Sequence, residues 1–207
     1  MVKQLDERYC LVAAPVKDST LVQILMKYQE ENTSGLAMIF TETCKMTQVL
    51  YLMLNDLGIE AVCLHSMITQ QERFSALARF KSSMVKVLVA TDVASRGLDI
   101  PMVGLVLNHT LPGIPKTYIH RVGRTARAGR KGQAVSIVTP NDLKLLLAIE
   151  ALCKTKMVAL EVDEDSVKKI MKQVNTTRRE QEIKLDRTDF DERRNINKRK
   201  KLIMQGK

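Results

Sequence analysis

The stretch Val85-Lys-Val-Leu-Val-Ala-Thr-Asp-Val-Ala-Ser-Arg-Gly-Leu-Asp99 decides the fold, because an apolar run passes directly into a polar segment. Residues 85–90 are rich in β-branched and aliphatic side chains, which predicts a buried strand. In α/β folds, ligands bind beyond the carboxyl ends of the strands. The stretch therefore predicts a strand whose carboxyl end carries the chemistry.

The polar half of this stretch has side chains suited to a nucleotide or nucleic acid. Thr91 can donate its hydroxyl to a phosphate, Gly97 permits a tight backbone path, and Asp99 can accept hydrogen bonds from a ribose hydroxyl. An internal ion pair between Arg96 and Asp92 explains those two residues equally well. The segment is more specific than any of its members.

Outward from this stretch, short apolar runs alternate with helical patterns. Strands are predicted at Tyr9–Ala13, Leu36–Phe40, Ala61–Leu64, Val85–Ala90, Val103–Leu107 and Ala134–Val138. Helices are predicted with a cap at Asp18 or Ser19, from the cap Thr43 to Gly58, from Gln70 to Phe80, and from Glu161 to Val174. This alternation predicts an α/β fold with a parallel sheet and helices on both faces.

Length and charge indicate one α/β domain and a basic tail that prefers a polyanion. The chain has 207 residues, 45% of them hydrophobic, and a net charge of +10. Residues 172–207 contain twelve Lys and Arg against six Asp and Glu, so +6 of that charge lies in the last part of the chain. Nucleic acid is therefore the first partner to consider.

The cysteines and the apolar runs favour an intracellular protein outside the membrane. The four cysteines are scattered without a close pair, which argues against structural zinc and a disulfide framework. No apolar run approaches the roughly 20 residues that span a bilayer. Residues 1–8 lack the apolar core of a signal peptide.

A second informative segment is Tyr118-Ile-His-Arg-Val-Gly-Arg-Thr-Ala-Arg127, which spaces three arginines at intervals of three. Arg121, Arg124 and Arg127 can share one face of a helical turn. Guanidinium groups are planar, always charged and suited to phosphate. Taken alone, the three arginines are explained as well by a solvated basic face.

A third segment begins at His65 and leads into the helix predicted from Gln70. Gln70 and Arg73 lie on one face of its first turn, where backbone N–H groups and a guanidinium can hold a nucleic-acid phosphate. An ordinary capped helix with Arg73 in solvent is the alternative. We interpret His65 as structural.

Together these segments resemble the second RecA-like lobe of a superfamily 2 helicase, and specifically of a DEAD-box RNA helicase. The resemblance covers roughly residues 8–155. Residues 91–99 and 120–127 look like the family's motifs V and VI, Ile39-Phe40 with Thr43 is similar to motif IV, and Gln70 with Arg73 is similar to the Gln-x-x-Arg element.

The resemblance implies a role for each matching residue. Arg127 would be the arginine finger at the γ-phosphate and Arg124 its partner, and both would bind ATP together with Gly97 and Asp99. The remaining roles are RNA-backbone contacts for Gln70, Arg73 and Thr91, and coupling between the lobes for Arg96, His120 and Arg121. No metal ligand is expected in this chain.

Three positions depart from the commonest family pattern. Ser66 stands where Gly is usual, Ser95 where Ala is usual, and Ala126 where Gly is usual. All three residues are small, and none is an expected phosphate contact.

A phosphate-binding Gly-x-x-x-x-Gly-Lys-Ser/Thr loop and an Asp-Glu-Ala-Asp magnesium site are absent from the sequence. The family has both on its first lobe, so the chain looks like half of an ATP-dependent RNA helicase that needs ATP, Mg²⁺, RNA and an N-terminal lobe. Alone, it should hydrolyse ATP negligibly. A non-catalytic RNA- or protein-binding module with a helicase-like fold is the competing hypothesis; the paired arginines count against it.

Two regions are expected: a helicase C-terminal RecA-like domain at residues 1–155, and a helical extension with a basic helical or extended tail at residues 156–207. Residues 193–201 hold six basic side chains in nine positions. This tail can add nonspecific RNA affinity, act as a nuclear-localisation signal or simply aid solubility. Tail and resemblance together suggest a nuclear or nucleolar role in ribosome biogenesis.

Overall fold

A single parallel sheet organises the chain in a computed structural model that describes residues 5–126, 131–188 and 190. The strands are β1 (Leu5–Leu11), β2 (Ala37–Thr41), β3 (Ala61–Leu64), β4 (Val87–Thr91), β5 (Leu105–Asn108), β6 (Gly132–Val138) and β7 (Val158–Ala159). Their order across the seven-stranded sheet is β3-β4-β2-β5-β6-β1-β7, and every pair is parallel. The predicted α/β class with a parallel sheet is confirmed.

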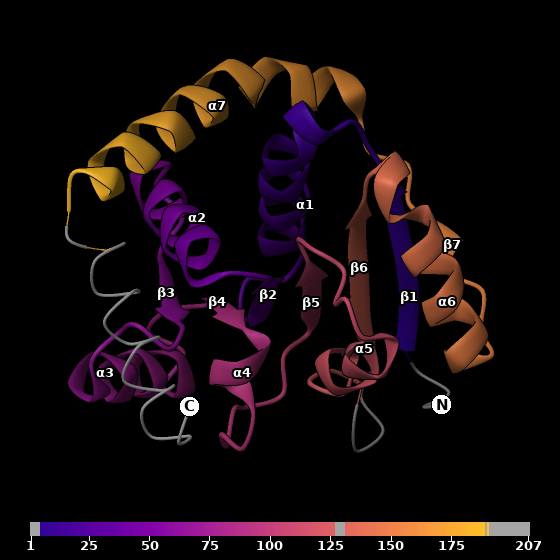
Figure 1. Cartoon of the computed structure of the whole chain (residues 1–207), viewed down its shortest axis with the longest axis horizontal. Helices are drawn as coiled ribbons and strands as arrows, with labels where there is room; N and C mark the ends of the chain where they lie inside the picture. Colours follow the sequence, from indigo (N-terminus) through magenta and orange to yellow (C-terminus); the bar gives the residue numbers. More distant parts are fainter. Residues whose placement is uncertain (1–4, 127–130, 189, 191–207) are drawn as a thin grey trace, which may run out of the picture.

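Helices cover both faces of this sheet (Figure 1). They are α1 (Lys17–Glu31), α2 (Cys44–Asp56), α3 (Gln70–Lys81), α4 (Asp92–Ser95), α5 (Pro115–Val122), α6 (Leu143–Cys153) and α7 (Glu164–Asp186), with short 3₁₀ turns at Ala14–Val16 and Pro140–Asp142. One face packs on α1 and α2, whereas the other packs on α3, α4, α5 and α6.

The central strands are buried on both faces, and alternate residues supply the two cores. In β2, Met38 and Phe40 pack on the side of α3 and α5, whereas Ala37 and Ile39 pack on the side of α1 and α2. All five residues of β2 and of β4 are buried. The strand period of two explains this division, since successive side chains point to opposite faces.

Local side-chain chemistry starts two helices, and the first of these caps was predicted. Thr43 caps α2, with its hydroxyl accepting a hydrogen bond from Met46 N at 3.1 Å. Thr69 and Glu72 form a reciprocal capping box at α3. After α2, Gly58 adopts a φ of +82°, as expected for a left-handed helix end.

The start of α1 differs from its prediction. The helix begins at Lys17 with Val16 at the cap position, not at a cap on Asp18 or Ser19. Asp18 lies inside the first turn, where it is only 6% exposed and bonds His109 and Arg178 instead of its own backbone. Asp18 therefore bonds side chains distant in the sequence and does not cap its own helix.

The helix predicted at Glu161–Val174 is longer than expected and runs from Glu164 to Asp186 as α7. It extends across the outer side of α1 and α2 (Figure 1). Val174 is 1% exposed, and the polar Gln181 is 4% exposed because its amide bonds Asp56 at the end of α2. The basic segment 193–201 lies outside the described residues.

Candidate functional site

The site is built on the segment that follows β4. Thr91 ends the strand and is buried beside Thr41 at the end of β2, its partner in the sheet register. Asp92 then opens the short helix α4. The Thr91 hydroxyl does not cap α4. The two strand ends place threonine residues side by side at the carboxyl edge of the sheet.

Among the residues that the structure describes, Arg121 is the largest fully buried side chain, and it contacts residues at the ends of β2, β4 and β5. It lies in α5, is 2% exposed, and bonds Asp92 through Nε–Oδ1 and Nη2–Oδ2, both at 2.7 Å. Its Nη1 donates to Asn108 Oδ1 at 3.1 Å and to the Thr110 carbonyl. Its Cζ lies 5.0 Å from the ring centroid of Phe40. The alternative pair of Arg96 with Asp92 is therefore wrong; Arg96 bonds the Thr117 hydroxyl at 3.3 Å.

The spacing of three does not place Arg121 and Arg124 on one helical face. Helix α5 ends at Val122 and Gly123 forms its C-cap, so Arg124 lies beyond the helix. Arg124 instead turns toward the segment after α4, where its Nη1 and Nη2 donate to the carbonyls of Leu98 and Ser95, each at 3.2 Å. Arg127 lies outside the described residues.

The loop that Arg124 holds has the geometry expected of a close backbone turn. Gly97 has a φ of +70°, a conformation that residues with a Cβ rarely adopt. Asp99 follows with a side chain 95% exposed and bonded to Lys81 Nζ at 2.8 Å. The hydrogen bond and charge of Lys81 lower the pKa of Asp99. The exposed Asp99 carboxylate can accept a hydrogen bond from a ribose hydroxyl in place of the one from Lys81.

Helix α3 lies against the same segment. Arg73 donates from Nη2 to the Ala94 carbonyl at 2.7 Å, so the alternative of an arginine in plain solvent is wrong. Gln70 is exposed at the first position of α3. The fold thus brings Arg73 to α4, just after the strand end that carries Thr91, whereas Gln70 lies exposed at the start of the same helix as Arg73. His120, in the last turn of α5, is exposed.

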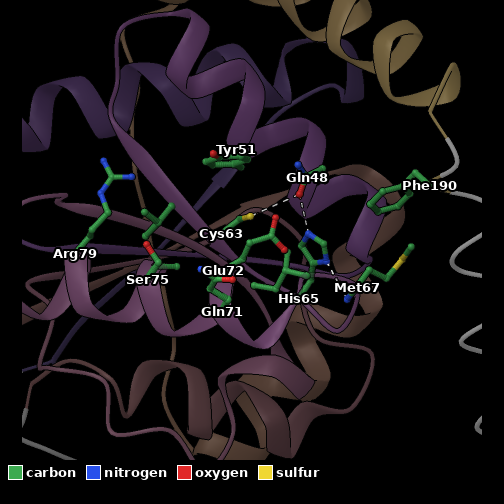
Figure 2. A pocket seen from close by; sticks show the side chains of 13 residues that line it. Gln48, Tyr51, Cys63, His65, Met67, Gln71, Glu72, Ser75, Arg79 and Phe190 are labelled. Carbon is green, nitrogen blue, oxygen red and sulfur yellow. Dashed lines mark hydrogen bonds between the residues drawn. The ribbon is translucent and has the colours of Figure 1, made fainter.

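His65 has the structural role expected of it. It is 2% exposed, its Nε2 lies 2.8 Å from Gln48 Oε1, and its Nδ1 accepts from Met67 N at 3.2 Å. Burial lowers the pKa of His65 to about 4, against a smaller opposite effect of Glu72. Figure 2 shows it between α2 and α3, in a pocket of about 460 Å³ that Phe190 also lines.

The sequence assigned no role to the buried polar residues beside Arg121, although the segment around Asn108 follows a predicted strand. Asn108 bonds both Arg121 and Ser136 Oγ, the latter at 3.1 Å, and His109 bonds Asp18 at 2.7 Å. The polar segment after the predicted strand at 103–107 was the available signal. Their partners lie far away in the sequence and have no local pattern.

Three comparisons with known proteins agree with this geometry. The family model described as "Helicase conserved C-terminal domain" matches residues 16–129, more than half of the chain. The chain belongs to this family. This helicase C-terminal domain is 55% identical over 206 residues to "Probable ATP-dependent RNA helicase DDX49" of Homo sapiens, covering 100% of the chain and 43% of that relative. It is 41% identical over 203 residues to "ATP-dependent RNA helicase dbp8" of Schizosaccharomyces pombe, covering 98% of the chain and 44% of that relative.

Solved structures place the helicase C-terminal domain in the same fold. The "S. cerevisiae Dbp5 bound to RNA and ADP BeF3" superposes with a TM-score of 0.72 and 36% identity, covering 84% of this chain and 46% of that one. The E. coli DEAD-box protein SrmB, solved with the regulator RraA, superposes with a TM-score of 0.71 and 34% identity. The match covers 78% of this chain and 94% of that one. The resemblance to the RecA-like C-terminal lobe of DEAD-box RNA helicases is confirmed. The chain spans less than half the length of the curated relatives described above.

Two further observations concern the described residues of the helicase C-terminal domain. Within them, no group of three or more His, Cys, Asp or Glu side chains is arranged to hold a metal ion. No helix in that part of the chain is long and apolar enough to cross a membrane.

Proposed function

We propose that this chain is the second lobe of an ATP-dependent RNA helicase, supplying RNA-backbone contacts and the arginine finger for RNA-stimulated ATP hydrolysis and local duplex unwinding. The observation that carries the proposal is the two-point pair between Arg121 and Asp92. It ties the segment after Thr91 to the arginine segment 120–127. A change at one segment is therefore transmitted to the other.

The proposed roles follow these two segments. Gln70, Arg73 and Thr91 hold the RNA backbone, because Arg73 places a guanidinium at α4 just after Thr91, and Gln70 lies at the N-terminus of the same helix as Arg73. Asp99 contacts the ribose and Gly97 lets the backbone approach the nucleotide.

The arginine segment provides the charge for catalysis. Arg127 is the finger at the γ-phosphate and Arg124 its partner, since guanidinium groups stabilise charge on a transferring phosphoryl group. Arg96, His120 and Arg121 couple the nucleotide and RNA sites between the lobes.

ATP and the other lobe complete the site. An exposed Asp99 and a half-buried Arg124 beside a glycine turn fit a nucleotide that arrives at the surface of this lobe. We assign Mg²⁺ to the N-terminal lobe, where it would neutralise charge on the phosphates. The isolated chain is therefore inactive as an ATPase. The basic tail supports a nuclear or nucleolar site of action, and we place the helicase in ribosome biogenesis there.

The test is RNA-stimulated ATPase activity of the full-length protein, intact and with Arg127→Ala. A finger contributes about 10³–10⁵ in rate, and we expect a loss approaching that size with RNA binding retained. Arg8→Ala, on the far strand β1 where Arg8 pairs with Asp6, is the matched control and should leave the rate unchanged. An ATPase rate indifferent to Arg127 contradicts the proposal and leaves a binding module.

A further inference from the structure

Helix α7 reaches the candidate site through a chain of polar side chains. Arg178, near the middle of α7, bonds Asp18 Oδ2 through Nη1. Asp18 lies in the first turn of α1 and its side chain is only 8% exposed. The other carboxylate oxygen, Oδ1, lies 2.7 Å from His109 Nε2. A helix of the extension is therefore bonded to the residue that follows β5.

The chain of contacts continues from His109 to Arg121. His109 is 3% exposed, and its Nδ1 lies 3.2 Å from Thr110 Oγ1. The carbonyl of Thr110 accepts from Arg121 Nη1, and Arg121 in turn holds Asp92. His109 N also donates to the Phe40 carbonyl at 3.0 Å, so the segment is fixed at strand β2 as well.

Electrostatics make the Asp18 link sensitive to its partners. Burial by itself would raise the pKa of Asp18, but the hydrogen bonds and charges of His109 and Arg178 outweigh it and lower the pKa to about 2. Asp18 is therefore a buried carboxylate at neutral pH. Removing Arg178 takes away one charged partner of this carboxylate and leaves it with the His109 hydrogen bond and the nearby charge of Lys17. The Asp18–His109 contact would then carry more of the stabilisation of the buried charge.

We propose that Arg178 of α7 is a positioning residue for Arg121: through Asp18, His109 and Thr110 it sets where the arginine segment 120–127 is held against Asp92. The effect on catalysis rests on the proposed function; the effect on the geometry of Arg121 does not. The helical extension is then a part of the catalytic lobe that tunes turnover without touching RNA or nucleotide.

The structure provides a matched control on the same helix. Lys184 lies two turns beyond Arg178 in α7 and pairs with Asp56 of α2 at 3.9 Å. Lys184→Met removes a cation that docks α7, as Arg178→Met does, but it leaves the link to His109 intact. A purely structural role for α7 predicts similar behaviour of both variants.

The first measurement is the NMR resonance of the Arg121 Nε–H group in the 207-residue chain. We expect Arg178→Met to shift this resonance and Lys184→Met to leave it in place. Arg178→Lys, which keeps the charge without the guanidinium fork, should give a smaller shift and serves if the methionine variant does not fold. An unshifted resonance in either folded Arg178 variant overturns the inference, whatever the chain does enzymatically.

The second measurement is RNA-stimulated ATPase activity of the full-length protein. Arg178→Met should lower kcat by about two- to thirty-fold with the KM for RNA unchanged, and Lys184→Met should not. In the double variant Arg121→Lys with Arg178→Met, the fold-loss of kcat should be smaller than the product of the two single losses, because both changes act on one contact. Equal effects of the two α7 variants, or full multiplicativity, contradict the inference. An intact protein without RNA-stimulated activity contradicts the proposed function instead.

Discussion

Arg121 and Asp92, 29 residues apart in the sequence, form a two-point ion pair with both N–O distances at 2.7 Å. Four N–H groups of this one guanidinium bond within the lobe, since Nη1 also serves Asn108 and Thr110. A guanidinium presents five such groups. Arg121 therefore holds the segments of the site together, and only one of its N–H groups remains to bind a phosphate.

Arg121→Gln should lower the free energy of unfolding by about 3 kcal/mol, because it leaves a buried acceptor set and a carboxylate without their cation. The free energy of unfolding of Arg121→Lys should lie between those of the parent and Arg121→Gln, since an ammonium keeps the charge but cannot make the two parallel hydrogen bonds. Urea denaturation of the chain measures both. Arg79→Gln, at an exposed arginine of α3, is the control and should stay within about 0.5 kcal/mol of the parent. If the Arg79 and Arg121 variants lost equal free energy of unfolding, the Arg121–Asp92 pair would contribute nothing to stability.

Gly132→Ala should destabilise the chain by about 1–3 kcal/mol through overpacking. A Cβ at Gly132 would lie 2.6 Å from the backbone nitrogen of Ala126 and closer still to Thr125 Oγ1. Gly113→Ala is matched to it, because a Cβ there meets nothing within 4 Å. Thermal unfolding of both variants decides the matter; a Gly132 variant as stable as the Gly113 variant would disprove the close approach.

Ala126→Gly should stabilise the chain by up to about 1 kcal/mol. Ala126 has a φ of +53°, a left-handed conformation that strains a residue with a Cβ. The commoner glycine at this position in the family therefore has a backbone reason. Ala78→Gly, in the interior of α3, should have the opposite sign and cost about 1 kcal/mol. A loss of stability in Ala126→Gly would mean that Ala126 is not strained.

His65 makes the stability depend on pH in the mildly acidic range. Its pKa is lowered from 6.5 to about 4, so the unfolded chain binds the proton more tightly and stability is lost as pH falls from about 6.5 to 4. The loss attributable to this group is on the order of 3 kcal/mol at pH 4. Urea denaturation of His65→Gln across this range should show a flatter profile than the parent.

His120→Gln, at an exposed histidine of α5, controls for the removal of one imidazole. Parallel profiles for the parent and His65→Gln would refute the buried neutral imidazole that Figure 2 shows bonded to Gln48.

Local patterns predicted the parts of the fold that local chemistry determines. The strand Ala61–Leu64, the Thr43 cap and the start of α3 at Gln70 all agree with the sequence prediction. Several strands are shifted by one to four residues; β1, for example, begins at Leu5 and not at Tyr9. Residues 6–8 of this strand are charged, and pairing with β6 extends the strand where composition alone would not.

Long-range partners explain what the sequence could not predict. Asp18 has the composition of a helix cap but is held by His109 and Arg178, which lie 91 and 160 residues away. The helix α7 continues past Asn175 because polar residues such as Gln181 bond α2, a reason that an apolar periodicity cannot express. The segments that form the site were predicted, whereas the contact that joins them, Arg121 to Asp92, was not. The catalytic roles of Arg124 and Arg127 stay predictions.

Both outermost strands of the sheet are short. β3 has four residues and β7 only two. An edge strand offers unpaired N–H and C=O groups on which a foreign strand can add, and short edges limit that addition. The lobe should therefore resist aggregation through its sheet edges, even at high concentration.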